Sequence, residues 1–245
     1  MEISLAAEKI GHLGPMPITN SLLTSWIATI FLVVIGIIST RNLAMIPKGI
    51  QNFFEMIVEF LLKTVDDVIQ DEEKTKKYFP LLATIFLFII ANNWLGLLPG
   101  VGTIGIHEHG KFIPLLRAGN ADLNTTLALA VVAVVSIQIF GILAIGFAKY
   151  SGKFINFKNP ISFFVGILEL ISELSRLVSF SFRLFGNIFA GEVLLAVIAY
   201  LLPFLGPLPF YALEIFVGFI QALVFTMLTL VFIKMAITDH ATESH

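Results

Sequence analysis

Seven charged side chains interrupt the apolar stretch that fills the last third of the chain, up to residue 237. They are Glu169, Glu173, Arg176, Arg183, Glu192, Glu214 and Lys234. A charge at the centre of a bilayer costs about 2.5–3.5 kcal/mol on insertion scales, so charges in apolar helices typically mark ion or proton pathways. These positions are therefore the first candidates for function.

Several of these residues share one face if residues 160–202 are helical. At about 100° per residue, the polar stripe spans roughly 80° and contains Glu169, Glu173, Arg176, Arg183 and Asn187. Small residues lie on the same side, namely Ser172, Ser179, Gly186 and Ala190. Because small side chains let another helix approach closely, we expect Arg183 to project from a groove that receives a helix.

A turn rich in Pro and Gly near Pro203 folds residues 207–237 back along residues 160–202. Positions equally far from this turn lie level, which places Arg183 near Gln221 and Ser172 near Lys234. Glu192 and Glu214 are then two carboxylates at one level without a local cation. Two like charges in a medium of low dielectric constant oppose joint ionisation, so this pair would exchange protons near neutral pH.

Arg183 has no acidic residue within one helical turn on its own face. We therefore expect its counter-charge on another chain. The alternative is that the charges form ion pairs that hold a helical bundle together, for which Glu173 and Arg176 are the best candidates.

The composition indicates that these residues belong to a membrane protein. Of 245 residues 57% are hydrophobic and 13% are charged, whereas soluble chains average about 45–50% apolar and about 25% charged residues. The mean hydropathy is +0.93. The net charge of −2 argues against a nucleic-acid partner. The absence of cysteine excludes disulfides and thiolate metal sites.

We predict an all-α membrane protein that forms a single membrane domain over residues 1–245, with about five transmembrane helices. Its expected parts are an external N-terminus (1–20), span 1 (21–40), an amphipathic helix (47–70), span 2 (79–98), an external loop (99–121), span 3 (122–148), a long helix (160–202), a final helix (207–237) and a cytoplasmic tail (238–245).

The segment 47–70 is too charged to span, yet its apolar residues recur at three- and four-residue spacing. This pattern predicts an interfacial amphipathic helix, with a core helix in a soluble cap as the alternative. The charged run 71–77 is interpreted as a solvated turn. Lys and Arg are concentrated in residues 41–77 and 149–158, which places these loops in the cytoplasm and the N-terminus outside.

Residues 160–202 are too long for an upright span. As one helix they would measure roughly 64 Å at 1.5 Å per residue, against a hydrocarbon core of ~30 Å. Either the helix breaks into a re-entrant pair, or it lies strongly tilted against a partner. We expect the chain to end in a long, strongly tilted antiparallel helical hairpin.

The run from Ser179 to Glu192, Ser-Phe-Ser-Phe-Arg-Leu-Phe-Gly-Asn-Ile-Phe-Ala-Gly-Glu, closely resembles the signature of subunit a of the F-type ATP synthase. Residues 92–100 (Asn-Asn-Trp-Leu-Gly-Leu-Leu-Pro-Gly) and 221–229 (Gln-Ala-Leu-Val-Phe-Thr-Met-Leu-Thr) resemble the same family. The similarity covers nearly the whole chain and is strongest over residues 169–237.

The resemblance implies a role for each candidate. Arg183 would face the carboxylates of a rotating ring of c subunits and block direct leakage between two aqueous half-channels. The positions that match the outer half-channel and its border with the arginine are Asn187, Glu192, Glu214 and Gln221. Those that match the cytoplasmic half-channel are Glu169 and Ser172. Arg176, Glu173, Ser179 and Lys234 are secondary candidates.

The implied function is that of a static, non-catalytic proton-translocating subunit that couples proton flow to ring rotation and ATP synthesis. Its expected partners are the c-subunit ring, the peripheral-stalk b subunits and the rest of the ATP synthase, in a bacterial plasma (inner) membrane or, alternatively, a thylakoid membrane. A Na⁺-coupled version of the same motor and a secondary ion transporter are the alternatives. No cofactor is expected, and the chain has no phosphate-binding glycine loop.

One histidine pair invites a metal interpretation. The residues are His107, Glu108 and His109 in the predicted external loop. No further ligand cluster is nearby, so we expect a solvated loop or a buffer at a channel mouth here and no metal site.

Overall fold

The computed structural model describes residues 7–14, 16–41, 49–98, 101, 104–108, 111–154, 160–203 and 205–238. The first six residues of the predicted external N-terminus lie outside this part of the chain. So does the predicted cytoplasmic tail, apart from residue 238.

The described residues form seven α-helices, one 3₁₀ turn and two antiparallel β-hairpins. The helices are α1 (Asn20–Arg41), α2 (Ile50–Ile69), α3 (Glu72–Gly96), α4 (Leu123–Ile145), α5 (Phe147–Phe154), α6 (Pro160–Leu201) and α7 (Pro207–Ile237), and the 3₁₀ turn is η1 (Gly119–Ala121). The hairpins pair β1 (Lys9–Leu13) with β2 (Met16–Thr19) and β3 (Gly105–Glu108) with β4 (Lys111–Pro114).

Within the described ranges, five helices are long and apolar enough to cross a membrane: α1, α3, α4, α6 and α7. This confirms the predicted class of an all-α membrane protein. The two short hairpins were not predicted, because their segments are rich in Gly and Pro and carry no sustained alternation of apolar and polar residues.

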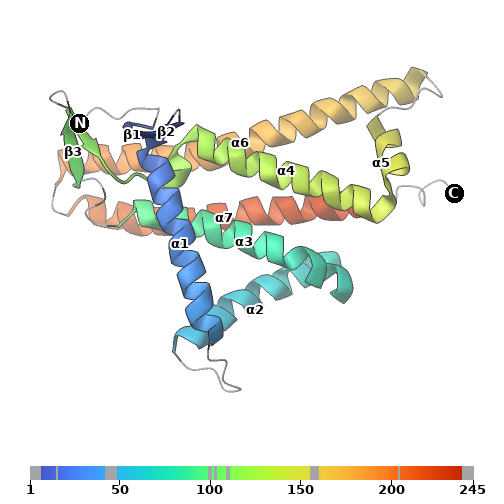
Figure 1. Ribbon diagram of the computed structural model, residues 1–245, viewed down its shortest axis with the longest axis horizontal. Helices are drawn as coiled ribbons and strands as arrows, with labels where there is room; N and C mark the ends of the chain where they lie inside the picture. Colours follow the sequence, from blue (N-terminus) through green and yellow to red (C-terminus); the bar gives the residue numbers. More distant parts are fainter. Residues whose placement is uncertain are drawn as a thin grey trace.

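The long helices α3, α4, α6 and α7 run side by side along the molecule, and α1 crosses them steeply (Figure 1). α6 is one unbroken helix of 42 residues, so the re-entrant alternative is wrong. The 22 residues of α1 measure about 33 Å, which matches a hydrocarbon core. The hairpin of α6 and α7 therefore lies at a steep angle to a helix of membrane-spanning length (Figure 1).

The start of α3 corrects the interpretation of residues 71–77 as a turn. The helix begins at Glu72, seven residues before the predicted span at 79. Asp71 caps it, because its carboxylate accepts a hydrogen bond of 3.2 Å from the Lys74 backbone N–H. Glu72 and Glu73 add negative charge to the first turn, where the helix dipole favours it. The charged run is thus the solvated first turn of a helix.

The end of α4 corrects the predicted span 122–148. Gly146, at a φ of 91°, ends the helix at Ile145, and the chain turns into α5. Tyr150 of α5 packs against Gly141 and donates a hydrogen bond of 2.5 Å to Gln138 Oε1. Burial raises the pKa of Tyr150 to about 12. The short helix α5 links the ends of α4 and α6 (Figure 1).

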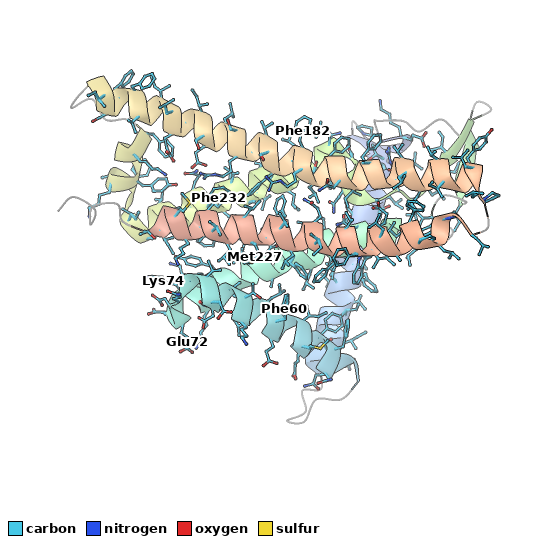
Figure 2. The ribbon with its side chains drawn as sticks, turned by 180° about the vertical axis from the view of Figure 1, so that it is seen from behind. Phe60, Glu72, Lys74, Phe182, Met227 and Phe232 are labelled. Atoms are coloured by element: carbon cyan, nitrogen blue, oxygen red, sulfur yellow. The ribbon has the colours of Figure 1, made fainter. Side chains whose placement is uncertain are left out.

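The amphipathic helix α2 packs one edge against the bundle. Leu61, Val65 and Ile69 are buried among residues of α3 and α7. Other apolar side chains, including Phe53 and Phe60, stay exposed, and Figure 2 labels Phe60 on this helix. α2 therefore has an apolar surface free to lie on a membrane, as expected of an interfacial helix.

The predicted external loop 99–121 is not solvated throughout. Its last part, residues 117–121, is buried against α1, α3 and α6. Gly119 makes this approach possible, because a Cβ there would lie 2.1 Å from Asn92 Oδ1 and 2.7 Å from Ser25 Oγ. The loop thus returns into the helical bundle before α4 begins.

Candidate ion-translocation site

Arg183 lies exposed on α6. Its hydrogen bond is a long one, 3.4 Å from Nη2 to Ser179 Oγ one turn earlier. No carboxylate of the described residues forms an ion pair with it. The neighbouring Phe182 is 56% exposed and points away from α7 (Figure 2). A cation therefore lies on an apolar surface, and none of the described carboxylates supplies its counter-charge.

One turn beyond Arg183, an amide pair joins the two helices of the hairpin. Asn187 Nδ2 donates to Gln221 Oε1 at 2.5 Å. Gln221 was predicted to lie level with Arg183, and its hydrogen bond instead goes to Asn187. The Gln221 side chain is 4% exposed, and its Nε2 has no hydrogen-bond partner in the described structure. Buried donors of this kind are rare and usually bind a water or a ligand.

Glu214 occupies a notch that Gly191 leaves in α6. A Cβ at Gly191 would lie 2.1 Å from Glu214 Oε2 and 2.4 Å from Oε1. Glu214 is 7% exposed, and no hydrogen bond or ion pair to it is found among the described residues. Glu214 is thus a buried carboxylate, and it lies within one residue of the predicted level, that of Glu192 on α6.

Glu192 corrects the expectation of two carboxylates without a cation. Arg117 Nε donates to both of its oxygens, at 3.1 Å and 3.0 Å. Arg117 belongs to the loop that returns into the bundle, and its side chain is 6% exposed. Sequence reasoning missed this partner because residues 99–121 were assigned as an external loop.

A cavity of about 270 Å³ opens between α6 and α7 on the side of Arg183 that leads towards α5. It is lined by Ser172, Ser175, Arg176, Ser179, Phe180, Arg183, Leu228 and Phe232. Three hydroxyls and two cations thus line one continuous hollow that ends at Arg183. Figure 2 shows Phe232 between the two helices.

Arg176, unlike Arg183, forms an ion pair with a carboxylate of the described residues. Its Nη1 lies 2.8 Å and 2.9 Å from the two oxygens of Glu173. Its guanidinium stacks on Phe232, with 3.8 Å from Cζ to the ring centroid. Glu173 and Arg176 therefore form the ion pair that the sequence analysis gave as the alternative to a role in ion transport.

Two further candidates do not line the cavity. Glu169 forms an ion pair with Lys153 of α5 at 2.6 Å. Lys234 was predicted to lie level with Ser172; its Nζ instead donates to the Val68 carbonyl at the end of α2, at 2.6 Å. Both contacts join neighbouring elements at the α5 end of the bundle.

A buried amide network at the other end of the bundle was also missed. Asn93 Nδ2 donates to the Gly218 carbonyl at 3.0 Å, and Asn120 Nδ2 donates to Asn93 Oδ1 at 2.7 Å. Ser25 Oγ donates to Asn92 Oδ1 at 3.0 Å. The signal was the Asn92-Asn93 pair in an apolar span, because a buried amide is costly unless it is hydrogen-bonded.

The structure does not describe the histidine pair completely. His109 and the side chains of His107 and Glu108 lie outside the described residues. Among the residues that are described, no group of three or more His, Cys, Asp or Glu side chains is arranged to hold a metal ion.

Comparison with known proteins decides the family. The family model for the ATP synthase A chain matches residues 22–234. The chain belongs to the ATP synthase A chain family. It is 36% identical to the ATP synthase subunit a of Moorella thermoacetica over 95% of this chain and 97% of that protein.

Other members are similar over comparable lengths. Identity is 37% to the ATP synthase subunit a of Campylobacter jejuni subsp. doylei over 82% of each chain. It is 36% to that of Gloeobacter violaceus over 96% of this chain and 93% of the relative. The resemblance seen in the sequence is thereby confirmed, and the chain is a multi-pass membrane protein.

Proposed function

We propose that the chain is the static ion-translocating subunit of a rotary ATP synthase, with Arg183 as the fixed charge between two aqueous half-channels. The observation that carries this proposal is the exposed Arg183, which has no counter-charge among the described residues. An uncompensated cation on an apolar face is costly in lipid. A ring of c subunits that presents carboxylates to this face supplies the missing partner.

The cytoplasmic half-channel is proposed along the cavity between α6 and α7. Its hydroxyl lining, which includes Ser172 and Ser179, supports a water-filled path that ends at Arg183. Glu169 belongs to the mouth of this path, where it is paired with Lys153. Glu173 and Arg176 hold the wall in place through their ion pair.

The outer half-channel is proposed on the opposite side of Arg183, past Glu214 and Glu192. Asn187 and Gln221 form the border, and the unpartnered Gln221 Nε2 offers a hydrogen bond to water or to a ring carboxylate. The two paths are offset along the tilted hairpin. A proton can therefore cross only by riding on the ring.

In the proposed cycle an external proton neutralises a ring carboxylate, which then moves into lipid. After nearly a full turn the carboxylate meets Arg183, and the fixed cation favours release of the proton into the cytoplasmic path. Each charge that crosses releases about 2.3 kcal/mol per 100 mV, which drives rotation and ATP synthesis in the catalytic head. The peripheral-stalk b subunits hold this chain against rotation, and the membrane is proposed to be a bacterial plasma membrane.

The test is ATP-driven acidification of inverted vesicles that contain the assembled complex, at equal ATP hydrolysis capacity. Arg183→Ala is expected to reduce acidification to the background level. Removing the side chain breaks one long hydrogen bond, so the fold should survive. Lys76→Ala is the matched control, because it removes an exposed cation that pairs with Glu72 on its own helix.

Undiminished acidification with Arg183→Ala would show that the fixed charge lies elsewhere. A Na⁺-coupled motor is distinguished in the same vesicles. Its transport requires Na⁺, and it continues when a protonophore dissipates the proton gradient.

A further inference from the structure

We propose that Arg117 is a positioning residue for the outer half-channel, which holds Glu192 as a fixed anion and leaves Glu214 as the carboxylate that carries the proton. This inference rests on the proposed function and divides the roles of its two outer carboxylates.

Arg117 is rigidly held. Its side chain is 6% exposed, and its Nε contacts both Glu192 oxygens at 3.0–3.1 Å. Its guanidinium also lies 5.7 Å from the centroid of the Phe189 ring. Its backbone N–H donates to Thr24 Oγ1 at 3.2 Å, which ties the loop to α1. The guanidinium therefore stays beside Glu192 and acts as its permanent counter-charge.

The segment that carries Arg117 is anchored to α3 and α1. Asn120 Nδ2 donates to Asn93 Oδ1 and to the Ile89 carbonyl, at 2.7 Å and 3.2 Å. Gly119 packs directly against Asn92 and Ser25. These contacts fix the height of the guanidinium against α6, which a solvated loop would not do.

Glu214 has a different environment at the same level. It is 7% exposed and lies in the notch at Gly191, the residue that precedes Glu192. It forms no ion pair among the described residues. The charged groups that act on Glu192 are Arg117 from the loop and Glu8 from the N-terminal segment. Glu214 lies across the hairpin against the preceding residue, Gly191. A buried carboxylate without a cation binds a proton more readily than one held in an ion pair.

The proton transfer then involves one carboxylate. An external proton forms an O–H bond on Glu214, and this bond breaks when the proton passes to a ring carboxylate. Glu192 stays charged throughout, and its charge is balanced by Arg117. The pair keeps the outer path polar and sets the electrostatic potential at Glu214.

The test measures ATP synthesis by the assembled complex in inverted vesicles, driven by a fixed K⁺ diffusion potential over a range of lumen pH. Glu192→Gln leaves Arg117 as an unbalanced cation, which opposes protonation of Glu214. We expect activity to survive, with its pH profile moved to more acidic lumen by about one pH unit. Glu214→Gln is expected to abolish synthesis at every pH.

Neutralising the cation shifts the profile in the opposite direction. Arg117→Gln leaves Glu192 as an unbalanced anion, so the profile moves to higher lumen pH by about one unit. In the double variant Arg117→Gln/Glu192→Gln both charges are absent, and the profile returns towards that of the native chain. A merely structural ion pair would lower activity without these opposite shifts.

The proposal is overturned if Glu192→Gln abolishes synthesis at every pH, because Glu192 is then itself a proton carrier. It is also overturned if the Glu192→Gln profile coincides with that of the native chain. The Glu192→Gln profile alone decides the question if Arg117→Gln does not assemble. Arg183→Ala, measured in parallel, tests the proposed function separately, because its loss of coupling does not depend on Arg117.

Discussion

The notch at Gly191 allows a direct test of Glu214 as the proposed outer proton-binding site. Gly191→Ala would place a Cβ 2.1 Å from Glu214 Oε2, 2.2 Å from Cδ and 2.4 Å from Oε1. Real Cβ atoms essentially never approach other heavy atoms closer than 3.0 Å. The carboxylate must therefore withdraw by about 1 Å, since atoms cannot overlap at such distances.

This displacement changes the site without destroying the fold. The atoms that the new Cβ meets belong to the end of a flexible side chain, so α6 and α7 can keep their packing. In a proton path, however, a misplacement of about 1 Å can cost about 10²-fold in rate. We expect Gly191→Ala to lower ATP-driven acidification by about 10- to 100-fold, while the complex still assembles.

The geometry also predicts a suppressor. Aspartate is shorter than glutamate by one carbon–carbon bond, about 1.5 Å, which is close to the required withdrawal. Gly191→Ala combined with Glu214→Asp should therefore pump better than Gly191→Ala alone. Gly36→Ala is the matched control, because a Cβ at this glycine of α1 meets no atom within 4 Å.

The assay is acidification of inverted vesicles, normalised to ATP hydrolysis capacity and to the amount of assembled complex. Native acidification by Gly191→Ala would refute the reasoning, because the carboxylate would then function outside its notch. A suppressor that pumps no better than the single variant would show that the notch has a structural role only.

Two further predictions concern stability. Asn93→Leu removes the hydrogen bonds to Gly218 and Asn120, so we expect a loss of about 1–3 kcal/mol in the free energy of unfolding. Denaturation in detergent should detect it, whereas Thr84→Val, which removes an exposed bond to Pro80 on the same helix, should change stability by less than about 0.5 kcal/mol. Because the folded chain raises the pKa of Tyr150 from 10.0 to about 12, its contribution to stability is fully present below pH 10 and is lost as the pH rises towards 12. Tyr150→Phe should remove this alkaline loss in pH-dependent unfolding, whereas Tyr200→Phe at an 88% exposed site should retain it; equal curves for the two variants would contradict the assignment.

The helices were predictable because their signals are local. Runs without charge set the spans, and the absence of a break in residues 160–202 indicated one long helix. The start of α3 was predicted wrongly because a local capping signal was given too little weight. Asp71 followed by Glu72 and Glu73 is a capping pattern, yet the charge of the run favoured a turn.

The partner of Glu192 was not predictable in this way. An antiparallel hairpin relates α6 to α7 by simple counting, which placed Glu214 level with Glu192, one residue from Gly191, against which it lies. Counting cannot predict where a loop of more than twenty residues folds. Arg117 reaches Glu192 only because Gly119 and Asn120 let the loop enter the bundle, and these are tertiary contacts.

The two ends of the hairpin are built differently. At the Glu214 end, buried amides from α3 and the returning loop fix the backbone on both sides of the carboxylates. At the other end, hydroxyls line an open cavity that leads to Arg183. In the proposed cycle, a proton that enters through the rigid end must reach an acceptor at a defined distance, whereas a proton that leaves through the open end needs only water and the fixed cation. This difference supports the proposal of an outer path with one discrete proton-binding site and a cytoplasmic path that is filled with water. Substitutions in the outer path should therefore depend on geometry to within about 1 Å, whereas serine-to-alanine changes in the cavity should act weakly and additively.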